Sequence, residues 1–267
     1  MLTPDLIRGK HRPFFGEEGQ PFDKLRANGL GWEVMETASH PDISPPLDQP
    51  RWLLWASVAI AAGVLLLVIV GAAIDRGHQF RIDRALLLAL RQPGQPGTPI
   101  GPAWLEAAMI DVTALGGVTV LPLVVTVTVI ALAIERRWLT MWLVLGATIS
   151  GSVAVDIAKA LVGRPRPDLV DHLVKVSSLS FPSGHSANSA IVYLTLATLL
   201  TQIIRRAALR RFVLAVAILL VVAIGCSRVY LGVHWPSDVL AGWSFGALWA
   251  LAWWAIGARL RLARARE

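Results

Sequence analysis

The sequence predicts an all-α protein, a bundle of six membrane-spanning helices. Hydrophobic residues make up 55% of the chain and charged residues only 16%, whereas a soluble domain carries roughly a quarter charged residues. The apolar residues fall in runs of roughly 17 to 25, the length at which a helix crosses the hydrocarbon core of a bilayer. Basic residues cluster between these runs, so the net charge of +7 indicates membrane topology and argues against a nucleic-acid-binding patch.

Residues 1–50 are polar, rich in Pro, Gly and acidic residues, and show no sustained period. We expect them to form a disordered cytoplasmic arm. No apolar core lies near Met1, so this arm is not expected to be a signal peptide. Residues 21–29 resemble a translated intergenic repeat found in some bacterial genomes, which offers Met35 as an alternative start.

The first expected span covers residues 52–74, with Trp52 and Trp55 as interfacial anchors at its beginning. We expect a loop after it. This loop contains the polar segment Arg81-Ile82-Asp83-Arg84 and then a Gly/Pro-rich segment at residues 92–102.

Residues 103–116 are partly apolar but include Glu106 and Asp111, which favours an interfacial helix between spans one and two over a full crossing. The remaining spans are expected at residues 117–134, 138–162, 186–204, 212–230 and 237–258. Residues 51–258 would therefore form one six-span domain, and residues 259–267 a basic cytoplasmic tail.

The Lys and Arg residues between the spans set the expected orientation. Basic clusters share one side of the six spans with the N-terminal arm, at residues 136–137, 205–211 and 259–266. The positive-inside rule makes this side cytoplasmic. We therefore expect both termini in the cytoplasm and the protein in a bacterial inner membrane. Three polar motifs fall on the opposite, periplasmic side at one depth, which indicates a single site.

The first motif is Lys159 followed by Arg166-Pro167. Lys159 ends the third span, and Gly163, Pro165 and Pro167 then stop the helix and turn the chain. Lysine offers a point charge and arginine a bidentate fork for phosphate oxygens. The alternative is that both are interfacial cations that extend toward water.

The second motif, Pro182-Ser183-Gly184-His185, immediately precedes the fourth span. Free N–H groups at a helix start, beside a glycine that permits close approach, can bind an anion. Ser183 could donate its hydroxyl to that anion, or it could simply cap the helix. His185 would lie at the edge of this cradle, where it could protonate a leaving oxygen.

The third motif, Ser227-Arg228-x5-His234-x3-Asp238, links the last two spans. Pro236 suits a first helical position, which places Asp238 in the opening turn of the sixth span. Its carboxylate could accept a hydrogen bond from one imidazole nitrogen of His234 and leave the other free to attack phosphorus. Arg228 would be a third phosphate-binding cation. The alternative role for Asp238 is stabilisation of the helix dipole.

Together the motifs K-x6-RP, PSGH and SR-x5-H-x3-D resemble those of the type 2 phosphatidic acid phosphatase superfamily, which shares its site with vanadium haloperoxidases. The chain matches every specified position, and the resemblance covers about residues 104–258. It implies that His234 is the nucleophile and forms a phosphohistidine, that Asp238 orients it, and that His185 is the general acid. The implied phosphate-binding residues are Lys159, Arg166, Arg228, Ser183 and Gly184.

The expected activity is that of an integral-membrane lipid phosphate phosphatase that needs no metal or other cofactor. Candidate substrates are undecaprenyl diphosphate, phosphatidylglycerophosphate and phosphatidic acid, and an outward-facing site favours the first. A phosphotransferase that passes the phosphoryl group to a lipid or sugar acceptor is the alternative. A vanadate haloperoxidase is disfavoured by the six spans, and a transporter or scaffold by the complete catalytic set. The oligomeric state stays open.

Several other residues receive no catalytic role. Cys226 is the only cysteine, which excludes an intrachain disulfide, and it is expected to pack in an apolar run. Four histidines show no metal-ligand spacing: His11, His40, His78 and His172. Asp156 lies three residues before Lys159 on the same helical face, so it could be functional, although a structural pairing with Lys159 or a neighbouring helix is favoured.

Overall fold

The computed structural model describes residue 63, residues 69–74 and residues 80–264. The expected N-terminal arm and most of the first expected span lie outside these residues. The described part is mainly helical, as predicted. Its elements are, in chain order, α2 Arg81–Ala89, β1 Arg91–Gln92, β2 Gln95–Pro99, α3 Ala103–Ala114, α4 Val120–Ile134, α5 Trp138–Val162, α6 Gly184–Ile203, α7 Ala207–Tyr230 and α8 Pro236–Arg264.

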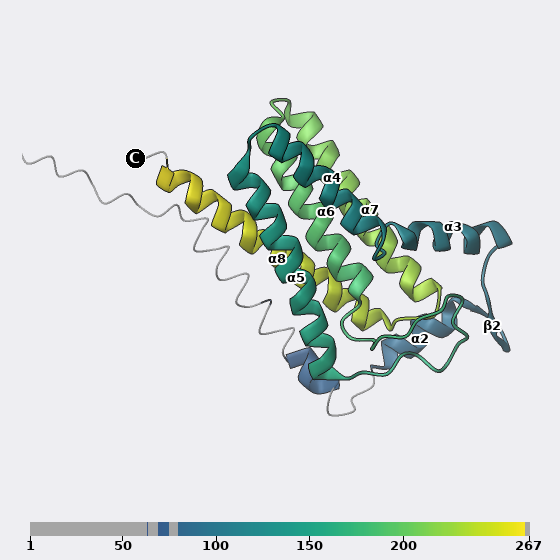
Figure 1. Ribbon diagram of the computed structural model, residues 1–267. Coiled ribbons are helices and arrows are strands. Elements are labelled where there is room, and N and C mark those ends of the chain that lie inside the picture. The colour runs from purple at the N-terminus through teal and green to yellow at the C-terminus, as the bar shows by residue number, and fades with distance from the viewer. Residues whose placement is uncertain (1–62, 64–68, 75–79, 265–267) are drawn as a thin grey trace, which may run out of the picture. The chain divides into compact units, whose positions relative to one another are not determined.

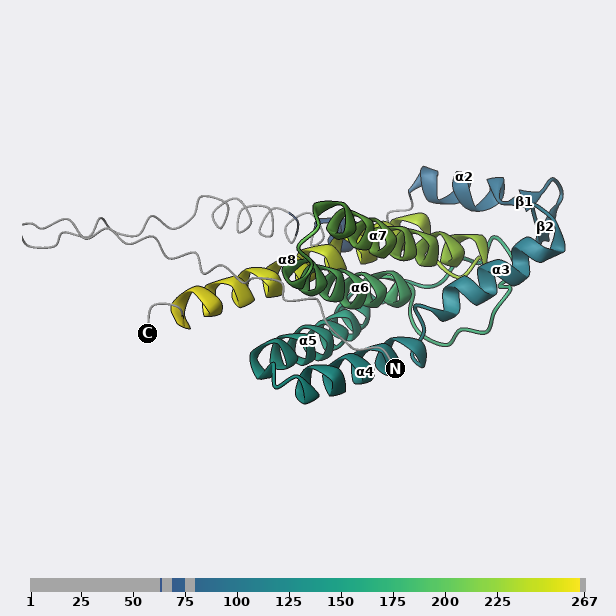
Figure 2. The same cartoon turned by 90° about the horizontal axis from the view of Figure 1, so that it is seen from above.

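Helices α4 to α8 form a bundle in which α6 packs against α5, α7 and α8 (Figures 1 and 2). Helices α5 and α7 end, and α6 and α8 begin, at the same end of this bundle, so all three sequence motifs meet there (Figure 1). We call it the motif end. The connection between α6 and α7 lies at the opposite end.

Three helices of the described residues are long and apolar enough to cross a membrane: α5, α7 and α8. Helix α4 is apolar but has only 15 residues. Helix α6 has 20 residues, and small polar side chains such as Ser186 and Ser189, which are fully buried, lower its hydropathy. The number of six spans and the interfacial position of α3 stay predictions.

The expected loop after the first span is wrong in part, because it contains α2 and a two-stranded antiparallel hairpin. Asp83 and Leu87 are one turn apart and both buried, so α2 docks on the protein through this face. The hairpin turn contains Gly94 at φ 75°, a conformation that suits glycine. The charges of the Arg81–Arg84 segment, which argued for a loop, instead lie on a short amphipathic helix.

The contact between α6 and α8 depends on glycine. A Cβ atom at Gly242 would lie 2.7 Å from the carbonyl oxygen of Ser183, and one at Gly246 would lie 2.5 Å from that of Ala187. Small residues of this kind allow the backbones of two membrane helices to approach closely. The close approach brings the start of α6 against the start of α8, where Ser183 N–H donates to the Asp238 carbonyl at 3.0 Å.

Candidate active site

The turn between α7 and α8 positions His234. Gly232 has φ 74°, and a Cβ atom there would lie 2.6 Å from Arg91 Nη2 and 2.8 Å from the Asp171 carbonyl oxygen. A residue with a side chain would therefore disturb this turn. Helix α8 then begins at Pro236, so Asp238 lies in its first turn. His234 is 1% exposed, and its Nδ1 lies 3.5 Å from Asp238 Oδ2.

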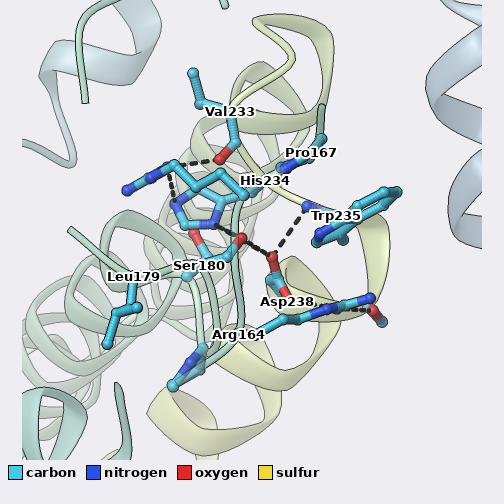
Figure 3. A network of polar contacts seen from close by, with 12 residues as sticks. Arg164, Pro167, Leu179, Ser180, Val233, His234, Trp235 and Asp238 are labelled. Carbon is cyan, nitrogen blue, oxygen red and sulfur yellow. Dashed lines mark hydrogen bonds and ion pairs between the residues drawn. The ribbon is translucent and has the colours of Figure 1, made fainter. Parts of the chain in front are cut away.

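Asp238 is surrounded by donors (Figure 3). Arg164 Nη1 donates to Oδ1 at 2.6 Å, and the Trp235 backbone N–H donates to Oδ2 at 3.0 Å. The Ser180 hydroxyl also donates to Oδ2 and lies 3.4 Å from His234 Nδ1. These bonds hold the carboxylate in one orientation beneath the imidazole, which favours the tautomer with the proton on Nδ1.

A second carboxylate supports this arrangement. Arg164 Nη2 donates to Asp83 Oδ2 at 2.9 Å, and the Ser237 backbone N–H donates to Asp83 Oδ1 at 2.8 Å. The Arg164 guanidinium also lies 5.1 Å from the ring centre of Trp235. Asp83, Arg164 and Asp238 thus form a buried chain of two ion pairs that connects α2 to α8.

Arg166 lies on the other side of His234. Its Nη1 is 3.3 Å from His234 Nε2, while Nε donates to the Ser178 carbonyl oxygen at 2.7 Å. Burial lowers the pKa of His234 to about 4; Asp238 opposes this shift, and the guanidinium groups of Arg166 and Arg228 add to it. The imidazole is therefore neutral at pH 7, and its Nε2 faces the cations.

The other two cations are also held in place. Lys159 Nζ donates to the carbonyl oxygens of Leu179 at 2.9 Å and Pro182 at 2.7 Å. Arg228 Nη1 donates to Thr113 Oγ1 of α3 at 2.9 Å, and its buried Nε has no partner among the described residues. Lys159 is thus bonded to backbone rather than extended into water, and Arg228 retains an unused donor.

One pocket of about 570 Å³ brings most of the sequence-predicted residues together. It is lined by both histidines, by the three cations and by Gly184, namely His185, His234, Lys159, Arg166, Arg228 and Gly184. A Cβ atom at Gly184 would lie 3.4 Å from Lys159 Cε, an ordinary van der Waals contact, so the lysine chain lies directly beside this glycine.

Two predicted residues do not line this pocket. Asp238 lies behind His234, as its proposed orienting role requires. Ser183 is fully buried, its hydroxyl accepts a hydrogen bond from Ser186 at 3.0 Å, and its side chain makes no helix-capping bond. Its contribution in this structure is therefore through the backbone, by the bond to the Asp238 carbonyl.

Sequence reasoning missed Arg164, Asp83, Ser180 and Thr113. Of these four, only Arg164 could have been found from the sequence. It lies two residues before Arg166, so it is a second arginine in the same turn of the first motif. The others are separated from their partners by 54 to 154 residues along the chain, and no local spacing links them. Among the described residues, no group of three or more His, Cys, Asp or Glu side chains could hold a metal ion.

Comparison with known proteins gives consistent results. A sequence model of the PAP2 superfamily matches residues 139–261. Phosphatidylglycerophosphatase B of Bacillus subtilis (strain 168) is 36% identical over 191 residues, which covers 69% of this chain and 87% of that protein. Decaprenylphosphoryl-5-phosphoribose phosphatase of Mycobacterium tuberculosis (strain H37Rv) is 40% identical over 122 residues, 44% of this chain and 61% of that protein.

A solved structure is also similar. The crystal structure of the transmembrane PAP2 type phosphatidylglycerolphosphate phosphatase from Bacillus subtilis matches with a TM-score of 0.67 and 30% sequence identity. The match covers 75% of this chain and 96% of that chain. The bundle and its motif end therefore belong to a fold already known in membrane phosphatases.

Proposed function

Because this chain belongs to the PAP2 superfamily and is an integral-membrane phosphatase of that type, we propose that it hydrolyses a lipid phosphate through a phosphohistidine on His234. The observation that carries this proposal is the single pocket in which His234 Nε2, His185 and three cations meet. The substrate would be a phosphomonoester or a diphosphate of a membrane lipid.

In the first step, the neutral Nε2 of His234 attacks phosphorus and an N–P bond forms. The bond between phosphorus and the lipid oxygen breaks, and His185 gives its proton to that oxygen. Burial and the nearby cations lower the pKa of His185 to about 3 before substrate binds, so the phosphate anion must raise this pKa for His185 to carry the proton. Asp238 accepts from Nδ1–H and stabilises the positive charge that develops on the ring. Lys159, Arg166 and Arg228 stabilise the charge on the phosphoryl oxygens, the role that a metal has in many other phosphoryl transfers.

In the second step, water attacks the phosphohistidine. His185, now neutral, takes a proton from this water, the N–P bond breaks, and inorganic phosphate leaves. Both histidines thereby return to their starting protonation states. A lipid or sugar hydroxyl in place of water would give the alternative activity, a phosphotransferase.

The pocket supports a lipid as the substrate. Beyond the cations it continues between α4, α5 and α6 along apolar side chains such as Leu121, Val125, Ile149 and Ile191. An amphiphile could therefore place its phosphate at the cations and its chain against the helices.

Because the motif end lies away from the Arg-rich α6–α7 connection, we propose that it faces the periplasm and that the protein lies in a bacterial inner membrane.

The test is phosphate release by the detergent-purified protein, with EDTA present, from phosphatidylglycerophosphate, phosphatidic acid and undecaprenyl diphosphate. We expect release from at least one lipid and its loss in His234→Ala, with the variant still folded as judged by gel filtration and thermal unfolding. Full activity in that variant would disprove the nucleophile assignment. Product that forms only with an added acceptor would favour the transferase.

A further inference from the structure

A polar stripe extends the phosphate site into the apolar part of the pocket. Thr148, Ser152 and Asp156 lie at four-residue intervals on α5, on the face that also carries Lys159, and all of them line the pocket. At about 1.5 Å per residue, Asp156 lies about 4.5 Å and Ser152 about 10.5 Å from Lys159 along the helix axis.

Asp156 has no bonded partner among the described residues and acts on Lys159 only through space. Lys159, its expected partner, donates instead to the Leu179 and Pro182 carbonyl oxygens. Among the described residues, Asp156 forms neither a salt bridge nor a hydrogen bond, and its side chain is exposed at the pocket. A carboxylate in a span is costly to keep without a partner, and such residues usually serve a substrate path.

The opposite wall carries a matching polar group. Asn188 lies three residues after His185 on α6, so the two side chains share a face, and both line the pocket. In an in-line displacement the leaving oxygen lies opposite His234 and next to His185. The group attached to that oxygen is therefore the first to meet Asn188 and Asp156.

We propose that Asp156, together with Asn188 and Ser152, binds the hydroxyl groups of the substrate's headgroup. The proposal rests on the lipid phosphatase function above and narrows it to phosphomonoesters of a polyol, such as a glycerol or a sugar, linked to a lipid. A carboxylate accepts strong hydrogen bonds from hydroxyl groups. The second phosphate of a diphosphate would instead stand beside Asp156 as a like charge.

This inference opposes the preference for undecaprenyl diphosphate that follows from an outward-facing site alone. A prenyl diphosphate has no hydroxyl group near the cleaved bond, so Asp156 would have nothing to accept from. Its only effect on the second phosphate would be repulsion.

The test compares phosphatidylglycerophosphate with an analogue whose headgroup glycerol lacks the free hydroxyl, using the wild-type protein and Asp156→Asn. We expect wild type to favour the natural headgroup in kcat/KM by roughly 10- to 100-fold, the effect of a hydrogen bond to a charged group. In Asp156→Asn this preference should largely disappear, mainly through a higher KM for the hydroxylated substrate, because the contact is remote from the reacting bond.

The same variant should hydrolyse farnesyl diphosphate several times faster than wild type, since the like charge is gone. Asp111→Asn on α3 is the matched control, because Asp111 is an exposed carboxylate that does not line the pocket. Asp111→Asn should leave unchanged the rates of hydrolysis of phosphatidylglycerophosphate, of its analogue without the hydroxyl group and of farnesyl diphosphate.

Two outcomes would overturn the inference and leave the phosphatase function standing. One is an equal loss on both headgroups in Asp156→Asn, which indicates a structural role. The other is wild-type protein that does not distinguish the two headgroups or that prefers farnesyl diphosphate. Absence of phosphate release from every lipid by intact wild type would overturn the proposed function and this inference with it.

Discussion

His234 is buried between one carboxylate and two guanidinium groups, and burial lowers its pKa to about 4. In the proposed mechanism only the neutral imidazole can attack phosphorus, so activity is expected above this pKa and should be lost as the pH falls through it. We expect kcat/KM to decline on the acid side near pH 4, well below the pKa of about 6.5 of a free imidazole.

The measurement is kcat/KM from pH 3.5 to 8 in detergent, with the substrate's own titration determined separately in the same micelles. Thermal unfolding at each pH shows whether the protein stays folded. An acid limb near pH 6.5 that the substrate does not explain would contradict a buried, neutral nucleophile.

At the residue scale, the sequence brings out the groups proposed to bind phosphate far better than the residues that hold those groups in place. His234 and Asp238 lie four residues apart, so their pairing can be derived from the start of one helix. Arg164 is different: it bridges Asp238, which is 74 residues away, and Asp83, which is 81 residues away. Such a pairing depends on how the helices pack, and one sequence contains no local signal for it.

At the element scale, the glycines of α8 set the position of α6 at the motif end. A methyl group in Gly242→Ala would meet the Ser183 carbonyl oxygen at 2.7 Å and Ser186 Cβ at 2.9 Å. Helix α6 must then shift, which weakens the bond from Ser183 N–H to Asp238. We expect a loss of about 1–3 kcal/mol in stability from overpacking and a roughly 10- to 100-fold loss in kcat from misplaced catalytic groups.

The measurements are thermal unfolding and kcat of the purified variant. Ala247→Val is the control, because Ala247 is exposed on the same helix. Unchanged kcat in a destabilised Gly242→Ala protein would mean that the α6–α8 contact supports the fold but not the geometry of the site.

Helix boundaries could be predicted where local chemistry marks them. Helix α5 runs from Trp138 to Val162 as expected, because Gly163, at φ 64°, ends it in a left-handed conformation. Helix α2 was not predicted, because it is short and one of its two buried residues is Asp83, a residue type that normally indicates solvent exposure. The burial of the Asp83 carboxylate is compensated by hydrogen bonds from Arg164 and Ser237, which lie far away in the sequence.

At the scale of the whole molecule, the two ends of the bundle differ in charge and in function. The residues proposed to be catalytic gather at the motif end, whereas the α6–α7 connection at the other end is flanked by Arg205, Arg206, Arg210 and Arg211 (Figure 1). The positive-inside rule then predicts a periplasmic site and a cytoplasmic α6–α7 connection.

The test introduces one new cysteine at an exposed position of each end. Each variant is made in a Cys226→Ser background, because Cys226 is the only cysteine of the chain.

In intact bacterial cells, a membrane-impermeant maleimide should label Asp168→Cys, in the loop after α5, and should label Arg210→Cys only after the cells are lysed. Both positions are exposed, so lysed cells provide the control for reactivity. Labelling of Arg210→Cys but not Asp168→Cys in intact cells would reverse the orientation and put the phosphatase site in the cytoplasm. Lipid phosphates would then have to reach the site from the inner leaflet, whereas the predicted orientation opens it to those of the outer leaflet.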